Sequence, residues 1–94
     1  MTIREFETLI EQDGPPDELT PELKAMWYDR KGDWMAAHEL VQDEGTEESA
    51  WVHAYLHRKE GDLQNAGYWY RRCGRPVCSD TLEREWARIT QALL

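Results

Sequence analysis

Two histidines four residues apart, His53 and His57, are the residues of this sequence whose type and spacing best suit chemistry. On a helix this spacing brings both imidazole rings to one face, where they form a ligand pair for zinc, nickel or copper. A third ligand would be His38 or a carboxylate. Two histidines alone do not hold a metal ion tightly, so we expect no tightly bound metal and no other cofactor. The alternative interpretation of function is a helical protein that binds a metal or small ligand through His53 and His57, with an enzyme left open.

Signatures of catalysis are missing around these residues and elsewhere in the chain. Ala54 follows His53, so the H-E-x-x-H motif of metalloproteases is absent. There is no nucleophile elbow, no phosphate-binding glycine loop and no dinucleotide fingerprint. We assign no catalytic residue, and we expect a binding protein rather than an enzyme.

The charge of the chain argues against two classes of partner. The formal net charge is −8, whereas nucleic acids and anionic membrane surfaces attract basic proteins. Residues 1–50 have 14 acidic and 4 basic side chains, and residues 51–94 have 5 and 7. A solvated surface accounts for this asymmetry, and head-to-tail self-association is the open alternative.

Two cysteines, Cys73 and Cys78, are too few for a zinc quartet, and their spacing is not that of a C-x-x-C redox pair. The sequence leaves open whether either has a redox role. Arg4, Glu5 and Glu7 near the N-terminus interrupt any apolar run, so no signal peptide or membrane anchor is predicted. We therefore expect a cytoplasmic protein with reduced thiols.

The elements that must position these residues are indicated by an internal repeat. The segment from Ala25 to Ala37 lines up with the segment from Ala54 to Ala66, and the second copy follows the first by 29 residues. Each copy has a small residue, about two turns of helical pattern, Gly-Asp, a large apolar residue and then an alanine. Self-similarity at a period of ~20–50 residues is typical of repeat architectures.

Helix signals recur along the whole chain and predict an all-α domain of about six helices. Apolar residues recur at helical spacing, and the last such stripe consists of Leu82, Trp86, Ile89 and Leu93. The breaks fall at glycine and proline, and the residues expected to cap the helices are Thr2, Thr20, Asp33, Thr46, Asp62 and either Ser79 or Asp80. No segment has the period-two pattern of a strand.

The two copies resemble tetratricopeptide repeats (TPR). In that family a first helix carries a small residue and then an aromatic one, a tight turn follows, and the second helix opens with an aromatic residue and an alanine. Ala25 and Tyr28, Gly32-Asp33, Trp34, Ala37 and Val41 match the first copy. Ala54 and His57, Gly61-Asp62, Leu63, Ala66, Tyr70 and Cys73 match the second.

The resemblance implies antiparallel helical hairpins over residues 20–76. It departs from the family because the period is shorter than the usual ~34 and because only two copies exist, where ~3 normally form a stable array. Pro21 and Ala50 also stand where the family has a tryptophan. We therefore expect a single TPR-like domain in which residues 1–19 form an N-terminal capping helix and linker, and residues 77–94 a C-terminal capping helix.

A protein or peptide partner is the function that this resemblance implies. In tetratricopeptide proteins the first helices of the pairs line the concave ligand-binding face, which would here display an aromatic floor with basic rims. The residues expected to bind the partner are Met26, Arg30, Trp51, Tyr55, Arg58 and Lys59. The sequence leaves open whether Trp51, Tyr55, His53 and His57 are exposed or belong to the core.

Overall fold

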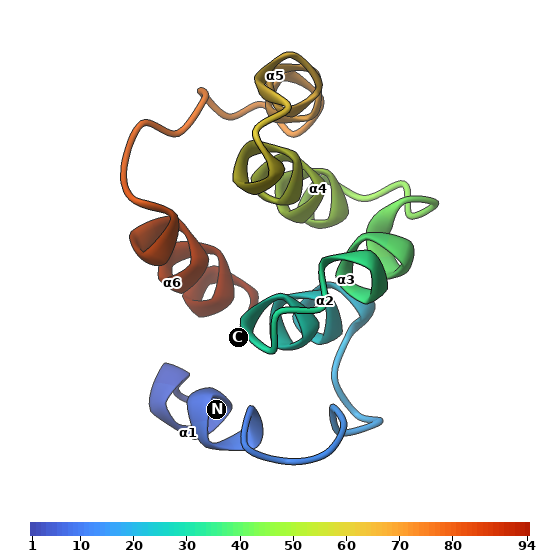
Figure 1. Cartoon of the computed structure of the whole chain (residues 1–94), viewed down its shortest axis with the longest axis vertical. Coiled ribbons are helices and arrows are strands. Elements are labelled where there is room, and N and C mark those ends of the chain that lie inside the picture. The colour runs from blue at the N-terminus through green and yellow to red at the C-terminus, as the bar shows by residue number, and fades with distance from the viewer.

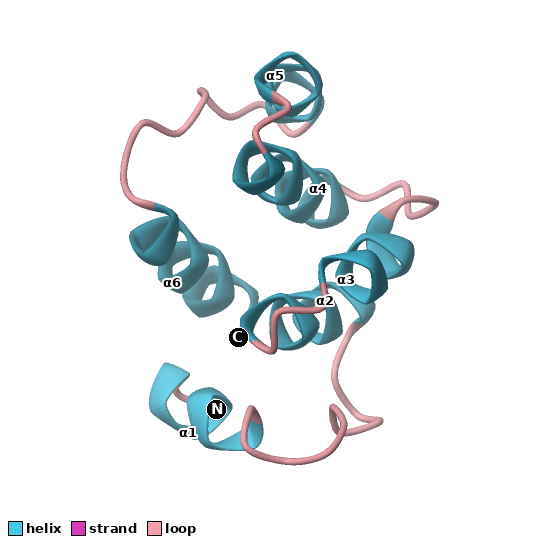
Figure 2. Ribbon diagram, viewed as in Figure 1, coloured by secondary structure: helices cyan, strands magenta, loops and turns pink.

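The computed structural model describes residues 1–94 and consists of six helices and no strand, which confirms the all-α prediction (Figures 1 and 2). None of these helices combines the length and the apolarity needed to cross a membrane. The helices are α1 (Ile3–Leu9), α2 (Pro21–Arg30), α3 (Trp34–Val41), α4 (Glu47–Glu60), α5 (Leu63–Arg72) and α6 (Leu82–Leu93).

Every helix begins at a threonine or aspartate whose side chain accepts a hydrogen bond from a free backbone N–H of the first turn. Five of these caps were predicted. The cap of α6 is a correction, because Thr81 takes this position instead of Ser79 or Asp80. The Asp80 carboxylate accepts the backbone N–H of Thr81 at 2.8 Å and so fixes the residue that precedes the helix.

The sequence repeat corresponds to two antiparallel hairpins, α2–α3 and α4–α5, which turn in the same way. Gly32 and Gly61 adopt φ angles of 86° and 92°, a left-handed conformation that glycine tolerates without steric cost. The next residue of each turn donates its backbone N–H to a helix carbonyl. Asp33 donates to Tyr28 and Asp62 donates to His57, both at 2.9 Å. The identical turns follow from the identical Gly-Asp steps.

The centre of the molecule is α4, in which every residue from Ser49 to His57 is buried. This helix contacts α2, α3, α5 and α6, and a helix buried on all sides needs no single apolar stripe. The repeat alanines Ala25, Ala37, Ala54 and Ala66 are each at most 1% exposed. Such small side chains let neighbouring helices approach closely.

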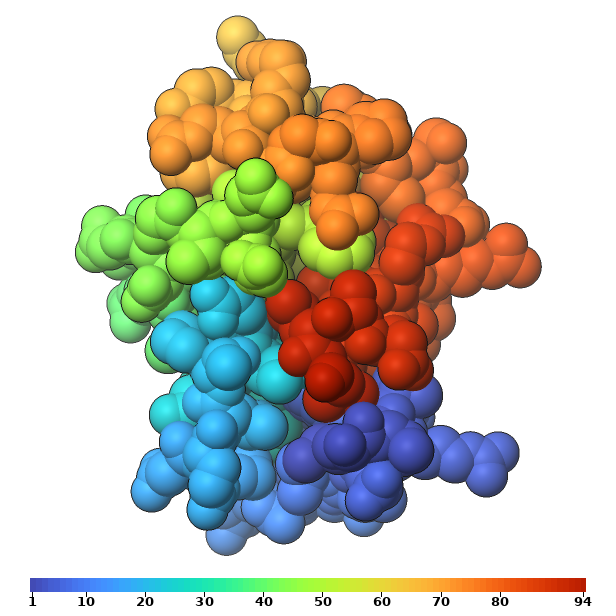
Figure 3. All heavy atoms as spheres, turned by 180° about the vertical axis from the view of Figure 1, so that it is seen from behind, coloured from blue at the N-terminus to red at the C-terminus, as the bar shows by residue number.

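The C-terminal helix α6 packs on α2 and α4, and α1 packs in turn on α6. In the apolar stripe predicted for α6, Trp86 and Ile89 are buried, and Leu82 and Leu93 are half-buried. The Trp86 indole N–H donates to the Met26 carbonyl at 3.1 Å, and its ring meets Phe6 of α1 edge-on. Seen from behind, α6 in red lies between the blue N-terminal segment and the orange end of α5 (Figure 3).

Candidate metal centre

The three histidines of the chain form one cluster between the two hairpins. His38 comes from α3, and His53 and His57 come from adjacent turns of α4. One nitrogen of each ring lies within 4.8 Å of the others. The Nε2 atoms of His38 and His53 are 2.9 Å apart, and the rings of His53 and His57 stack at a centroid distance of 4.7 Å. His38, the third ligand considered from the sequence, therefore joins the predicted pair.

His53 is the most buried member of the cluster and has an unsatisfied nitrogen. The residue is 4% exposed, and its Nδ1 atom has no hydrogen-bond partner. Its ring stacks on the Trp69 indole at 3.9 Å. Burial, followed by the neighbouring His38 and His57, lowers the pKa of His53 to about 4, because an imidazolium would lose its hydration there. A neutral imidazole is the form in which histidine binds metal ions.

His57 is oriented by two polar neighbours. Its Nδ1 atom lies 2.6 Å from Oε2 of Glu60, and its Nε2 atom lies 3.3 Å from the side-chain nitrogen of Asn65 on α5. A carboxylate that accepts the Nδ1–H of a histidine fixes the tautomer and leaves the Nε2 lone pair available. This arrangement is common behind histidine ligands of metal ions.

Two tryptophans wall the cluster. Trp34 stacks on His38 at 4.8 Å and meets the edge of His57, and its indole N–H donates to the Leu56 carbonyl at 2.8 Å. Trp69 covers His53 from α5. Burial, followed by the charge of His57, also lowers the pKa of His38. Two of the three rings, His38 and His53, are therefore held as neutral imidazoles between apolar surfaces.

The residues predicted to bind a protein partner do not form an open groove. Met26, Trp51 and Tyr55 are 0%, 6% and 2% exposed, so the expected aromatic floor belongs to the core. The physical reason is that α6 packs on the faces of α2 and α4 that would line the groove. Only the basic rim remains accessible, and its members are already paired.

Each basic residue of that rim has an acidic partner. The Arg30 guanidinium lies 2.8 Å from Glu83, and the Lys59 ammonium donates to Asp29 at 2.9 Å. Arg58 is half-buried and contacts Glu85 of α6 at 2.8 Å. Replacing Tyr55 and Arg58 together is therefore expected to destabilise the fold, contrary to the neutral outcome that an exposed stripe would give.

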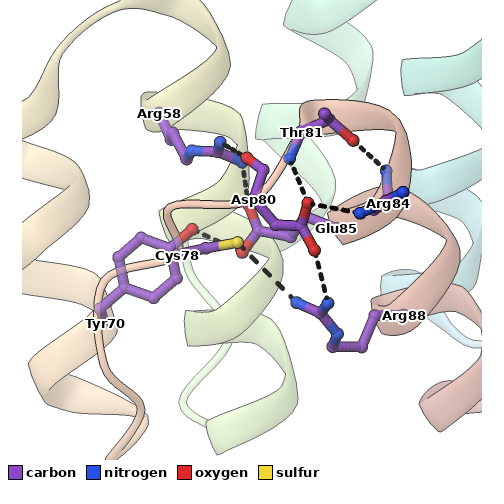
Figure 4. Close-up of polar contacts among 8 residues, drawn as sticks. All are labelled: Arg58, Tyr70, Cys78, Asp80, Thr81, Arg84, Glu85 and Arg88. Atoms are coloured by element: carbon purple, nitrogen blue, oxygen red, sulfur yellow. Dashed lines mark hydrogen bonds and ion pairs between the residues drawn. The ribbon is translucent and has the colours of Figure 1, made fainter.

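The Arg58–Glu85 pair is the centre of a polar network at the junction of α4, α5 and α6 (Figure 4). Glu85 is 1% exposed. Its Oε2 atom also accepts a hydrogen bond from the Tyr70 hydroxyl, with 2.5 Å between the two oxygens. Arg58 donates to the backbone carbonyl of Asp80 as well. Every charged or polar group of this network has a partner.

The two cysteines lie apart from the histidine cluster and are both free. Cys78 is half-buried and lies 3.8 Å from a guanidinium nitrogen of Arg88 (Figure 4). Cys73 is buried, and this burial raises the pKa of its thiol. Its thiol donates to the Tyr70 carbonyl at 3.3 Å. Neither thiol is among the groups that converge with the histidines.

The sequence interpretation missed three residues of these two regions. Glu85 could have been found, because it shares the helical face of Leu82, Trp86 and Ile89 and therefore had to be buried or paired. Glu60 follows His57 by three residues, which is also one helical face. Asn65 gave no signal, since its place beside His57 depends on how α5 packs on α4.

Comparison with protein-family models, with curated proteins and with solved structures finds no match to this chain. The resemblance to tetratricopeptide repeats therefore stays a prediction. The function of this protein is therefore inferred from the geometry of its own residues.

Proposed function

We propose that this protein binds a divalent transition-metal ion, best matched by zinc, through His38, His53 and His57. The observation that carries the proposal is the convergence of all three histidines of the chain, from two helices, so that one nitrogen of each ring lies within 4.8 Å of the others. Imidazole ligands suit zinc, copper and nickel, and three histidines are an established zinc donor set.

The spacing of the donors supports this proposal. Three nitrogens bound to one tetrahedral zinc ion at ~2.0–2.1 Å lie about 3.3 Å from one another. The closest pair in the cluster is 2.9 Å apart, and no pair exceeds 4.8 Å. The proposal requires that rotations of the side chains within the present backbone bring the three nitrogens to this spacing.

Zinc titration of the metal-free chain tests the proposal. We expect one ion per chain and, at a free concentration one hundred times the Kd, a gain of about 2.7 kcal/mol in the free energy of unfolding. For a domain of this size that gain raises the Tm by roughly 10 °C or more. Calorimetry gives the stoichiometry, and a thermal melt gives the stabilisation.

The controls separate the histidines from the thiols. His53→Ala and His38→Ala should abolish the thermal shift, whereas Cys78→Ser should keep it because Cys78 lies outside the cluster. Zinc binding that survives both histidine variants, or that disappears with Cys78→Ser, contradicts the proposal.

Protein binding is the second candidate function, and one surface pocket favours it. Arg30, Tyr55 and Lys59 of the predicted partner-binding set line this pocket together with Asp29, Gly32, Leu82 and Glu83. A partner with acidic side chains would compete with Asp29 and Glu83 for the two basic residues. A single segment of a protein or peptide could therefore engage half of the predicted set.

A pull-down with the variant pair Arg30→Ala and Lys59→Ala tests this second candidate. Loss of a captured protein in the double variant, measured at a temperature where this variant is still fully folded, supports binding at this pocket. The variant Arg84→Ala, which changes an exposed arginine outside the pocket, is the matched control and should retain the partner. Equal capture by all variants rules this pocket out as the binding site.

A further inference from the structure

The Arg75 guanidinium lies on the face of a tryptophan ring and has no acidic partner. Its central carbon is 3.5 Å from the centre of the Trp51 ring. Arg75 is exposed and forms no ion pair. In the view from behind, orange atoms at the end of α5 lie against yellow-green atoms of α4 (Figure 3). A cation over an indole ring at an exposed site is held weakly, so a competing group can displace it.

The backbone of Arg75 is fixed, whereas no polar contact holds its side chain. Gly74 has a left-handed φ of 72° after the end of α5, and the Arg75 backbone N–H donates to the Tyr70 carbonyl at 3.0 Å. The chain then forms neither helix nor strand until α6 begins at Leu82. Uncovering the Trp51 ring therefore requires a turn of this one side chain and breaks no backbone hydrogen bond.

Trp51 and Arg75 are shared by two surface pockets. The larger pocket, of about 360 Å³, lies at the loop between α5 and α6, and its lining includes Val77, Asp80 and Glu85. The smaller pocket, of about 120 Å³, lies at the start of α4, and its lining includes Glu47 and Glu48. Because both pockets are lined by Trp51 and Arg75, displacement of the Arg75 side chain would join them across the tryptophan ring.

The charges around this ring favour a cation. Glu47 and Glu48 are exposed and form no ion pair, and apart from Arg75 they are the only charged residues of the smaller pocket. In the larger pocket each carboxylate is already paired with an arginine (Figure 4). An anion would therefore meet two free carboxylates, whereas a cation in place of Arg75 would be attracted by them.

We propose that the Trp51 ring, with Glu47 and Glu48 beside it, binds an arginine side chain from a basic segment of a partner protein, and that Arg75 occupies this site until the partner displaces it. The Arg75 contact itself shows the chemistry, because a planar guanidinium stacks on an aromatic face. The free carboxylates can accept charge-assisted hydrogen bonds from the same segment. The net charge of −8 attracts a basic segment from a distance. Neither pocket contains a histidine, so this inference is independent of the metal site.

Titration with a short capped peptide that has a single arginine between glycines tests the inference. The full chain is kept at constant pH and ionic strength, and NMR follows the indole N–H of Trp51, identified as the signal that disappears in Trp51→Phe. We expect a saturable shift of this signal. The same peptide with citrulline in place of arginine keeps the shape without the charge and should cause no shift. No saturable shift with the arginine peptide, or equal shifts with both peptides, overturns the inference.

Arg75→Ala tests whether Arg75 occupies the site. Removal of the competing guanidinium should tighten binding of the arginine peptide roughly two- to fivefold. Arg72→Ala is the matched control, because Arg72 is also exposed and lies over aromatic rings but lines neither pocket. This variant should leave the affinity nearly unchanged. An equal gain in both variants shows a general charge effect and overturns the inference.

A second pair of variants tests the two free carboxylates. Glu47→Gln together with Glu48→Gln should weaken peptide binding roughly threefold or more. Asp43→Asn together with Glu44→Gln removes the same charge from exposed residues outside both pockets and should have a smaller effect. Equal losses in the two double variants contradict the placement of the site. Methylguanidinium that binds as tightly as the peptide would show that the ligand is a small guanidinium compound and would overturn the assignment to a protein partner.

Discussion

The central helix α4 presents two polar regions on opposite faces, and they differ in one respect. On the face toward α6, Arg58 and Tyr70 both donate to the buried carboxylate of Glu85. On the face toward α3, His53 is just as buried, yet its Nδ1 atom has no partner. Both regions bury polar groups in the same small core, and of the two only the Glu85 network is fully partnered. Thr90 Oγ1 of α6, outside both regions, is the other buried side-chain atom without a partner.

The difference shows which region stabilises the fold and which is available for another purpose. A buried polar group without a partner costs about 1–3 kcal/mol, and folded proteins rarely retain one without a reason. A metal ion bound between the facing Nε2 atoms of His38 and His53 would give the fold a reason to keep these buried imidazoles. We therefore interpret the Glu85 network as structural and the histidine cluster as the functional site, and the predictions below test this division.

The largest effect is expected for Glu85→Ala. Removal of this carboxylate leaves the Arg58 guanidinium and the Tyr70 hydroxyl without their partner inside the fold, and breaking a buried ion pair typically costs ~3–5 kcal/mol. Urea denaturation should show this loss in the free energy of unfolding.

Glu83→Ala is the matched control on the same helix. The Glu83 side chain is 72% exposed and pairs with Arg30 at the surface, so its loss should cost no more than about 1 kcal/mol. Equal effects of the two variants would contradict the structural role assigned to the Glu85 network.

A second test uses alkaline pH. Burial, then Asp29, raises the pKa of Tyr55, and burial, then the hydrogen bond to Glu85, raises the pKa of Tyr70. A phenol whose pKa is raised by folding stabilises the folded state below its unfolded pKa of about 10, and this stabilisation is lost as the pH rises above that value. Each tyrosine should contribute a decline approaching about 1.4 kcal/mol per pH unit.

The free energy of unfolding measured between pH 8 and pH 11.5 checks this expectation. Tyr55→Phe and Tyr70→Phe should each reduce the slope above pH 10, because phenylalanine has no proton to lose. A stability that stays constant up to pH 11.5 would show that the two hydroxyls are not buried as described.

Much of the region around α4 could be predicted from the sequence, because local chemistry determines it. The Gly-Asp steps at Gly32 and Gly61 predicted two hairpins. The four-residue separation of His53 and His57 predicted that both lie on one helical face. The packing of α6 could not be predicted in the same way. It depends on contacts between residues far apart in the chain, such as the Trp86 indole and the Met26 carbonyl. This packing turns the expected groove residue Tyr55 into a core residue.

The smallest effect on stability is expected for His53→Leu in the metal-free protein. Leucine is similar in size and removes the unpartnered Nδ1 atom, which offsets the loss of the contact with Nε2 of His38. We therefore expect the free energy of unfolding to change by less than about 1 kcal/mol, with zinc binding abolished. Tyr70→Phe in α5 removes one hydroxyl from the satisfied Glu85 network and should cost roughly 1–2 kcal/mol, although the change in volume is small. Urea denaturation of both variants without metal provides the measurement. A loss for His53→Leu that exceeds the loss for Tyr70→Phe would mean that the histidines stabilise the fold by themselves, and the division between a structural and a functional face of α4 would be wrong.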